Sequence, residues 1–439
     1  MNSEVPVTVI GAGLAGSECA WQLARRGIPV RLVEMRPQVM TPAHTSGNFA
    51  ELVCSNSLRG NELSSAAGLL KEELRRLDSL IMECAEETKV AAGGALAVDR
   101  EAFSEQVTSR LKRHGLVEFI CEEARGIPGG DVVIATGPLT SQGLSARIQE
   151  LFPGRNYLNF FDAVAPIVSL ESIDMDRAFY ASRYDKGGDD YINCPMTKEE
   201  YIPFREALKD AEAAEVHGFE DGMVFEGCMP IEVMAKRGED TMRYGPLKPV
   251  GLKNPATGEE YYAVVQLRRD NATGTLYNLV GFQTHLKFSE QKRVFSMIPA
   301  LHKAEFARYG VMHMNTYIDS PRLLDRYYRL ISDKRIRFAG QITGVEGYIE
   351  SCASGLLCGL ELAASLRGKP AIDFPRETAI GALALYVSDG TIADFQPMNI
   401  NFGIIQPLGY KVRGKRNKNM EISSRALEII DGIAGGLRI

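Results

Sequence analysis

Long hydrophobic runs are missing from the 439-residue sequence, and none approaches the roughly 18 residues that a membrane-spanning helix needs. The chain starts with the polar and acidic stretch Met1 to Glu4, which does not resemble a signal peptide. CxxC pairs are absent, and the 6 histidines show no HxxxH spacing, so neither a zinc site nor a thioredoxin-type redox centre is indicated. We therefore expect a cytoplasmic protein without a metal site.

Cysteine and net charge are also low. The 8 cysteines are too few for a disulfide framework, and we expect Cys19, Cys84, Cys121 and Cys352 to be small buried side chains. The formal net charge of −6 argues against a protein whose whole surface binds nucleic acid, but it allows one basic face. With 45% hydrophobic and 24% charged residues, the composition is that of a globular protein of two or three domains.

A β–turn–α–β unit stands near the N-terminus. Residues 7–10 form a predicted buried strand, the turn after it reads GAGLAG (11–16), and a predicted helix covers 17–26. A second predicted strand, 29–33, ends at Glu34. A GxGxxG turn between a strand and a helix, followed by an acidic residue after the second strand, is typical of a dinucleotide site.

Each residue type in this unit has a physical role. Gly11 permits the tight turn, Gly13 lets the backbone approach a pyrophosphate, and Gly16 lets the helix pack closely on the sheet. The helix N-terminus offers free N–H groups to the phosphates. Glu34 is placed to accept hydrogen bonds from ribose hydroxyls.

Features further along the chain favour FAD over NAD or S-adenosylmethionine. A strand at 131–137 ends in Ala-Thr-Gly, and a late strand at 335–339 leads through a glycine-rich turn into a helix at about 348–366. This order resembles flavoproteins with two-dinucleotide-binding folds, in which the late helix points at the flavin ring. The expected cofactor-binding residues are Gly11, Ala12, Gly13, Leu14, Ala15, Gly16, Glu34, Gly137, Gly340, Gln341 and Gly347.

The expected fold class is α/β, a Rossmann-type FAD-binding domain with an inserted α+β domain. We predict the first part of the FAD domain at 1–166, the inserted domain at 167–291, and the second part with a basic C-terminal segment at 292–439. The polar loop at 41–64 is long enough to be functional. A second GxGxxG and a CxxxxC pair are absent, so we expect NAD(P)H to reach the flavin without a Rossmann domain of its own.

Seven segments resemble the folate- and FAD-dependent tRNA (uracil-5-)-methyltransferase family, short relatives of the large GidA-type flavoproteins. They are GAGLAGSECAWQLA (11–24), LVCSNSLRG (52–60), ATGPLTS (135–141), FEGCMPIE (225–232), VGFQTHLK (280–287), YGVMHMNTYI (309–318) and FAGQITGVEGYIES (338–351). The match runs nearly end to end. The chain lacks the long C-terminal helical extension of the GidA type, which favours the short family.

The resemblance implies transfer of a one-carbon unit from 5,10-methylenetetrahydrofolate to carbon 5 of a uridine in the tRNA T-loop. In that family FAD carries both the one-carbon unit and the reducing equivalents, which NAD(P)H supplies. The resemblance also implies that Cys228 is the nucleophile at uracil carbon 6 and that Cys54 lies near the flavin, where it assists methylene transfer or removes the carbon 5 proton. His285 is expected to bind folate by stacking on the pterin.

The residue chemistry agrees with this function. Carbon 5 of uracil is a poor nucleophile until a thiolate adds to carbon 6, so a uracil methylase needs a reactive cysteine. Cys54 and Cys228 are the two thiols in polar or glycine-rich surroundings, although spacing alone does not distinguish their roles.

Positive charge is concentrated in one segment, where we expect RNA to bind: Lys411, Arg413, Lys415, Arg416 and Lys418. A solvated charge run is the alternative interpretation. Arg322, Arg326 and Arg329 recur at helical spacing and form either a second basic stripe or an exposed helix face.

Three other functions stay open at this level. The same chemistry on ribosomal RNA fits the motifs equally well, because they do not identify the RNA. An NAD(P)H-linked flavin oxidoreductase acting on a small molecule leaves the two cysteines and the basic segment unexplained. A non-catalytic flavin-binding RNA chaperone would bind RNA without forming a product.

Overall fold

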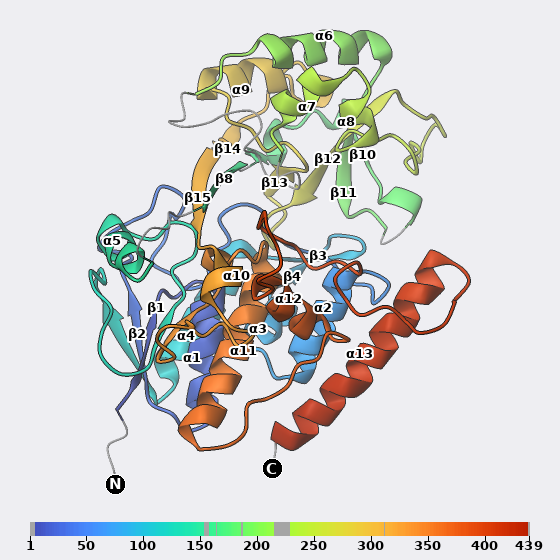
Figure 1. Ribbon diagram of the computed structural model, residues 1–439. Helices are drawn as coiled ribbons and strands as arrows, with labels where there is room; N and C mark the ends of the chain where they lie inside the picture. Colours follow the sequence, from blue (N-terminus) through green and yellow to red (C-terminus); the bar gives the residue numbers. More distant parts are fainter. Residues whose placement is uncertain are drawn as a thin grey trace.

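The computed structural model describes residues 5–152, 158–163, 165–185, 188–214, 229–310 and 312–437. Within these ranges the buried apolar side chains form two hydrophobic clusters, which correspond to the lower and upper parts of the molecule in Figure 1. The strands β8 (Leu158–Ala163) and β15 (Met312–Tyr317) lie between the two parts and pair antiparallel. The chain therefore leaves the lower part, builds the upper one, and returns.

The lower part contains a parallel five-stranded sheet in the order β16-β7-β1-β2-β6. Its strands are β1 (Val7–Ile10), β2 (Val30–Glu34), β6 (Val117–Cys121), β7 (Val132–Ile134) and β16 (Ile336–Phe338). β1, β7 and β16 are buried at every residue, as expected for continuous apolar runs in a sheet covered on both faces. The predicted Rossmann-type α/β fold is confirmed.

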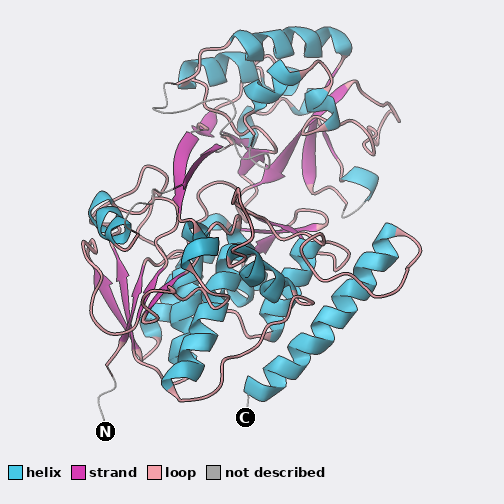
Figure 2. Ribbon diagram, in the orientation of Figure 1, coloured by secondary structure: helices cyan, strands magenta, loops and turns pink. Residues whose placement is uncertain are grey.

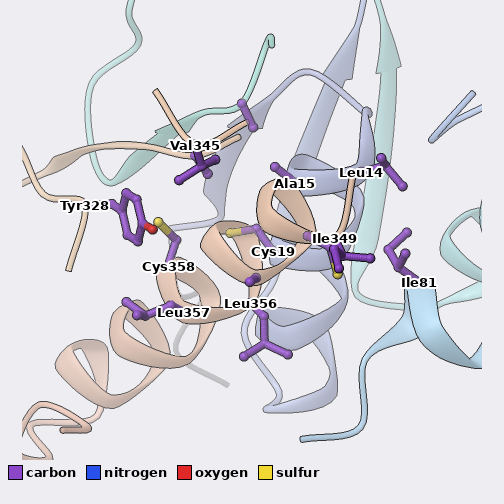
Figure 3. Close-up of a cluster of buried hydrophobic side chains, with 14 of the residues drawn as sticks. Leu14, Ala15, Cys19, Ile81, Tyr328, Val345, Ile349, Leu356, Leu357 and Cys358 are labelled. Carbon is purple, nitrogen blue, oxygen red and sulfur yellow. The ribbon is translucent and has the colours of Figure 1, made fainter. Parts of the chain in front are cut away.

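Two helices, α1 (Leu14–Arg25) and α11 (Tyr348–Leu366), pack against each other along small residues, as Figure 3 shows for the side chains around Ala15 and Cys19. A Cβ added at Gly355 would lie 2.1 Å from the carbonyl oxygen of Ala15, so only glycine allows this approach. Contrary to the expectation that no segment approaches a membrane span in length and apolarity, α11 does so among the described helices, and 89% of that window is buried inside the protein.

The remaining helices of the lower part surround this pair and a small sheet. The sheet contains β3 (Ser57–Gly60), β4 (Lys89–Val90) and β5 (Ala95–Val98). The helices are α2 (Ala66–Arg76), α3 (Leu80–Glu87), α4 (Arg100–Arg113), α5 (Gln142–Glu150), α10 (Ser320–Leu323), α12 (Ala379–Val387) and α13 (Lys415–Leu437). The chain breaks between α2 and α3, because Asp78 has φ +58° and Ser79 caps a new helix by accepting a hydrogen bond from the Met82 N–H.

The upper part is an antiparallel six-stranded sheet in the order β10-β11-β12-β13-β9-β14, covered by helices (Figure 2). Its strands are β9 (Ile167–Ser169), β10 (Phe179–Tyr180), β11 (Tyr191–Met196), β12 (Ala263–Arg269), β13 (Leu276–Leu279) and β14 (Phe306–Arg308). Its helices are α6 (Lys198–Asp210), α7 (Ile231–Arg237), α8 (Thr241–Tyr244) and α9 (Phe288–Phe295). Short 3₁₀ turns cover Leu170–Ser172, Met175–Arg177, Arg183–Asp185 and Pro299–Leu301, with a further one in the lower part at Gln341–Thr343.

The predicted end of the inserted domain at residue 291 lies inside this upper part. Val294, Phe295 and Leu301 belong to the upper hydrophobic cluster, and β14 forms an edge of its sheet. The domain limits stay a prediction, and this packing favours a boundary after β14.

Candidate active site

A groove opens at the carboxyl ends of β1, β2 and β7, where parallel α/β sheets usually bind their ligands. Its cavity volume is about 140 Å³, and the groove is partly open to solvent. The N-termini of α1 and α11 both reach it, through Leu14 and Ala15 on one side and Tyr348 and Ser351 on the other. Two helix N-termini at one groove offer free N–H groups and positive dipole ends to an anionic ligand.

The glycine turn is shaped for close approach. Gly11 has φ +97°, and a Cβ there would lie 2.6 Å from the Ala135 carbonyl oxygen. A Cβ at Gly16 would lie 1.8 Å from the Gly11 carbonyl oxygen. A Cβ at Gly13, by contrast, would meet nothing within 4 Å, so the space beside Gly13 faces the open groove. This arrangement leaves the backbone of Gly13 accessible to a phosphate.

Glu34, at the end of β2, accepts a hydrogen bond at 2.9 Å from the Ala12 N–H and forms a 3.0 Å ion pair with Arg36. Burial alone raises the pKa of this carboxyl, but the charge and hydrogen bonds of Arg36 and the Ala12 N–H outweigh burial and hold the pKa below its ordinary value. Glu34 is therefore an ionised acceptor in the groove wall. Arg36 also contacts Glu51 at 3.3 Å and fixes the start of the polar loop beneath it.

Most of the expected cofactor residues are brought together by the fold. Those that line the groove are Gly11, Gly13, Leu14, Ala15, Glu34, Gly137, Gly340 and Gln341. Ala12, Gly16 and Gly347 do not line it: Ala12 and Gly16 support the turn from behind, and Gly347 is the N-cap of α11. The assignment of these residues to a cofactor stays a prediction.

Cys54 is half-buried in the polar loop next to this groove. The N–H groups of Cys54 and Ser55 donate to the Tyr348 hydroxyl at 2.8 and 3.2 Å, and Tyr348 and Val53 both line the groove. Arg100 holds the other side of the loop by donating to the Leu52 carbonyl at 2.6 Å. The fold thus places the Cys54 loop against the N-terminus of α11, at the end of the groove where that helix contributes.

Cys228 lies outside the described residues, so its position relative to Cys54 stays a prediction. The described chain resumes at Met229, and Glu232 follows in α7. His285 contacts this carboxylate, with its Nδ1 2.5 Å from Glu232 Oε1, and its backbone N–H donates to the same oxygen at 2.9 Å. His285 is buried and is not part of the groove wall described above, and its contact with folate stays a prediction.

The basic segment is exposed and is split between two kinds of structure. Lys411 and Arg413 lie in a loop, whereas α13 begins at Lys415, so the segment spans a loop and the first turn of a helix. Arg416 reaches to within 3.6 Å of Glu62. α13 is fixed to the lower part by hydrogen bonds such as the one at 2.7 Å from Ser423 to the Leu63 carbonyl.

The second basic stripe is wrong. Only Arg322 lies in a helix, the four-residue α10, and all three arginines are bound to acidic side chains. Their ion pairs are Arg322–Asp319 at 2.8 Å, Arg326–Asp373 at 2.7 Å and Arg329–Asp325 at 2.8 Å. Among the described residues, no group of three or more His, Cys, Asp or Glu side chains is arranged to hold a metal ion.

Several residues of this region were not foreseen. Tyr348 stands in a motif that the sequence showed, but nothing marked its hydroxyl as the acceptor for the Cys54 loop. Arg100 and Arg268 contact that loop from distant elements, and no local signal points to either of them. The spacing of Glu34 and Arg36 could have indicated their ion pair, since a cation two residues after the acid of the fingerprint is close enough to bind it.

The parallel sheet, the glycine turn and the second helix N-terminus at one groove define a dinucleotide-binding protein of the flavoprotein type. A family model described as "Glucose inhibited division protein A" matches residues 6–370. The chain is 60% identical to the methylenetetrahydrofolate–tRNA-(uracil-5-)-methyltransferase TrmFO of Acetivibrio thermocellus, covering 97% of both chains, and 56% identical to that of Bacillus subtilis, covering 99% of both. The chain therefore belongs to the family of these methyltransferases within the wider GidA family.

Solved structures agree on the fold. The GidA protein of Aquifex aeolicus superimposes with a TM-score of 0.70 at 15% identity, covering 98% of this chain and 74% of that one. The match shows that the two proteins share their overall fold.

Proposed function

We propose that the protein transfers a one-carbon unit from 5,10-methylenetetrahydrofolate to carbon 5 of a uridine in the tRNA T-loop. The observation that carries this is the near full-length identity with relatives named for that reaction, joined to a groove of matching chemistry next to Cys54. Ribosomal RNA or a small molecule as the substrate is not favoured, because those relatives are named for tRNA.

FAD fits the groove as its cofactor. The backbone of Gly13 and the N-terminus of α1 would hold the pyrophosphate, and Glu34 would accept hydrogen bonds from the ribose. The N-terminus of α11, with Tyr348 and Ser351, would face the ring. When bound, FAD supplies a carrier for the one-carbon unit and a store of reducing equivalents. We assign NAD(P)H as the source of those reducing equivalents.

The two cysteines supply the remaining chemistry. The Cys228 thiolate forms a bond to carbon 6 of uracil, and the electron pair of the C5–C6 double bond moves into an enolate that makes carbon 5 nucleophilic. Once carbon 5 has received its substituent, Cys54 takes the proton from carbon 5, the double bond re-forms and the carbon–sulfur bond breaks. His285, fixed by Glu232, is the side chain that we assign to the folate pterin.

The basic segment binds the RNA phosphates in this proposal. Since the net charge of −6 repels a polyanion as a whole, affinity has to come from a local cluster that releases counterions. Lys411, Arg413, Lys415 and Lys418 are exposed and form such a cluster at the start of α13. The reaction then takes place in the cytoplasm, where tRNA is modified.

The test is direct. Incubation of the purified protein with unmodified tRNA, methylenetetrahydrofolate and NADPH, followed by digestion, should give 5-methyluridine in the tRNA. Cys228→Ala should lower product formation at least about 10³-fold while the flavin stays bound and reducible. Cys194→Ala is a matched control, since that thiol is buried among apolar side chains and should be dispensable. Near wild-type product from Cys228→Ala, or product in ribosomal RNA only, would contradict the proposal.

A further inference from the structure

The loop that carries Cys54 is held by side chains from three separate elements. From α11, the Tyr348 hydroxyl accepts from the Cys54 N–H at 2.8 Å. From α4, Arg100 donates to the carbonyls of Leu52 at 2.6 Å and Cys54 at 3.4 Å. The third element is β12 of the upper part, which contributes Arg268.

Arg268 donates hydrogen bonds to the side chains of the two residues directly after Cys54. Its Nη2 donates to the Ser55 hydroxyl at 2.6 Å and its Nε donates to Asn56 Oδ1 at 3.0 Å. Asn56 is fully buried, and its amide donates to the carbonyls of Val98 at 3.0 Å and Arg269 at 2.9 Å, so it links the loop to both parts of the molecule. A guanidinium with two divergent donors fits this arrangement, whereas a single ammonium does not.

The charge of Arg268 is unusual for its surroundings. The residue is only 8% exposed, and within the described residues it makes no ion pair. Burial lowers the pKa of its guanidinium, and the groups whose negative charge would raise it again are Tyr191 of β11, Asp270 just after β12 and the Cys54 thiol. Because a buried cation that makes no ion pair is costly, it stabilises negative charge on the groups around it.

The other charged groups around the thiol add to the same field. Arg100 from α4 and Arg308 from β14 both lie within electrostatic reach of Cys54, as does the neutral Tyr348 hydroxyl from α11. Asp270 neutralises Arg100 through a 2.8 Å ion pair, and Glu51 of the same loop is taken up by Arg36 at 3.3 Å. Among the described residues Arg268 and Arg308 make no ion pair with a carboxylate, although Asp270 lies within electrostatic reach of Arg268 and Glu51 within reach of Arg308.

From this geometry we propose that Arg268 is a positioning residue that orients the Cys54 loop across the two parts of the protein and places a buried positive charge within reach of the Cys54 thiol. The relevance for methyl transfer rests on the role given to Cys54 under Proposed function. Arg308 contributes charge but contacts the polar loop eleven residues before Cys54, by donating to the Ala43 carbonyl at 3.3 Å.

The experiment measures the alkylation of Cys54 by iodoacetamide in the holoenzyme between pH 5 and 10, with the Cys54 peptide quantified by mass spectrometry. Arg268→Met should lower the rate at pH 7 about tenfold and move the midpoint of the rate–pH curve upward by about one unit, because one nearby cation shifts a thiol by about that amount. Arg268→Lys should recover most of the midpoint shift, since it restores the charge.

Two further variants keep the test decisive if Arg268→Met does not fold. Ser55→Ala removes the acceptor of Nη2 and leaves the arginine in the chain, and it should lower the rate about two- to threefold. Arg205→Met is the matched control, because Arg205 is a mostly buried arginine of the upper part whose contacts are to Glu206 and the Ala235 carbonyl.

An unchanged midpoint in folded Arg268→Met, or an unchanged rate in Ser55→Ala where Arg268→Met does not fold, would overturn the proposal. Equal shifts in Arg205→Met would do the same, since the effect would then not be specific to Cys54. The alkylation profile is independent of product formation. A shifted profile in a protein whose Cys54→Ala variant still makes 5-methyluridine would therefore refute the role of Cys54 and leave that of Arg268 intact.

Discussion

The groove and the Cys54 loop lie side by side but are built in opposite ways. The groove is built around backbone features: a glycine turn, two helix N-termini and the ends of parallel strands. The Cys54 loop is held by long charged side chains that come from α4 and β12, far away in the sequence. A site formed by backbone groups needs glycines at fixed positions, and their spacing is visible in the local sequence. A site formed by side chains from distant elements is visible only once the fold has brought those elements together.

The difference also affects how each region responds to mutation. In the glycine turn beside the groove, an added methyl group meets either a backbone atom at 1.8 Å, as at Gly16, or nothing within 4 Å, as at Gly13. In the loop, several hydrogen bonds act together, so the removal of one leaves others in place. We therefore expect all-or-none effects in the first region and graded effects in the second.

The largest effects are expected from a pair of glycine variants. Gly16→Ala should destabilise the fold by about 3 kcal/mol or more, because the new methyl group overlaps the Gly11 carbonyl and the backbone must move. Gly13→Asp should leave the thermal unfolding temperature nearly unchanged but lower flavin affinity at least about 100-fold by bulk and charge. Thermal unfolding and the ratio of flavin to protein measure the two effects. A Gly13→Asp protein that is still yellow, and so still binds flavin, would show that Gly13 does not face the ligand and does not differ from Gly16 in this respect.

A smaller, pH-dependent effect is expected at Lys71 in α2, which supports β3 just after the Cys54 loop. Its Nζ donates to the carbonyls of Leu58 at 2.8 Å, Arg59 at 3.3 Å and Gly60 at 2.6 Å. Burial, with help from the charge of Arg75, lowers the pKa of Lys71 from its ordinary value of 10.5 to about 7.

The sign of this linkage follows from the protons bound. Between pH 7 and 10.5 the unfolded chain keeps a proton on Lys71 that the folded protein has released, so folding stability rises with pH across this window and levels off below pH 7. Wild type should gain about 3 kcal/mol relative to Lys71→Met between pH 7 and 10, measured by urea unfolding. Parallel stability curves for the two proteins would show that Lys71 is charged in the folded state throughout.

The basic segment should show a graded effect on binding. Replacing Arg413, Lys415 and Arg416 by Ala should weaken tRNA binding and reduce the slope of log affinity against log salt by roughly 0.7 to 0.9 for each phosphate that is no longer neutralised. The slope should change by about 1.4 to 1.8 in total, the value for two cations and not three, because Arg416 lies near Glu62. NADPH oxidation should be unchanged. An unaltered affinity at low salt would identify the segment as a solvated run.

The smallest effect is expected at Arg322. Its guanidinium is bound to Asp319 at 2.8 Å, so little of its charge is available to a phosphate. Arg322→Ala should change tRNA affinity less than about twofold at low salt, against a marked decrease for the basic segment. A decrease equal to that of the triple variant would place the RNA on the α10 side of the molecule instead.

The sequence by itself determined the parallel α/β fold and the candidate dinucleotide groove, because glycine spacing, buried strands and helix starts are local and each has one physical interpretation. It did not reveal that Arg322, Arg326 and Arg329 are paired to acids, since helical spacing is a pattern of separation and the chain there leaves the helix after Leu323. Only the tertiary structure brought Arg268 to Ser55 and Tyr348 to Cys54, across more than 200 residues of chain. Such contacts depend on how two sheets and a helix pack against one another, and this packing cannot be inferred from any short stretch of sequence.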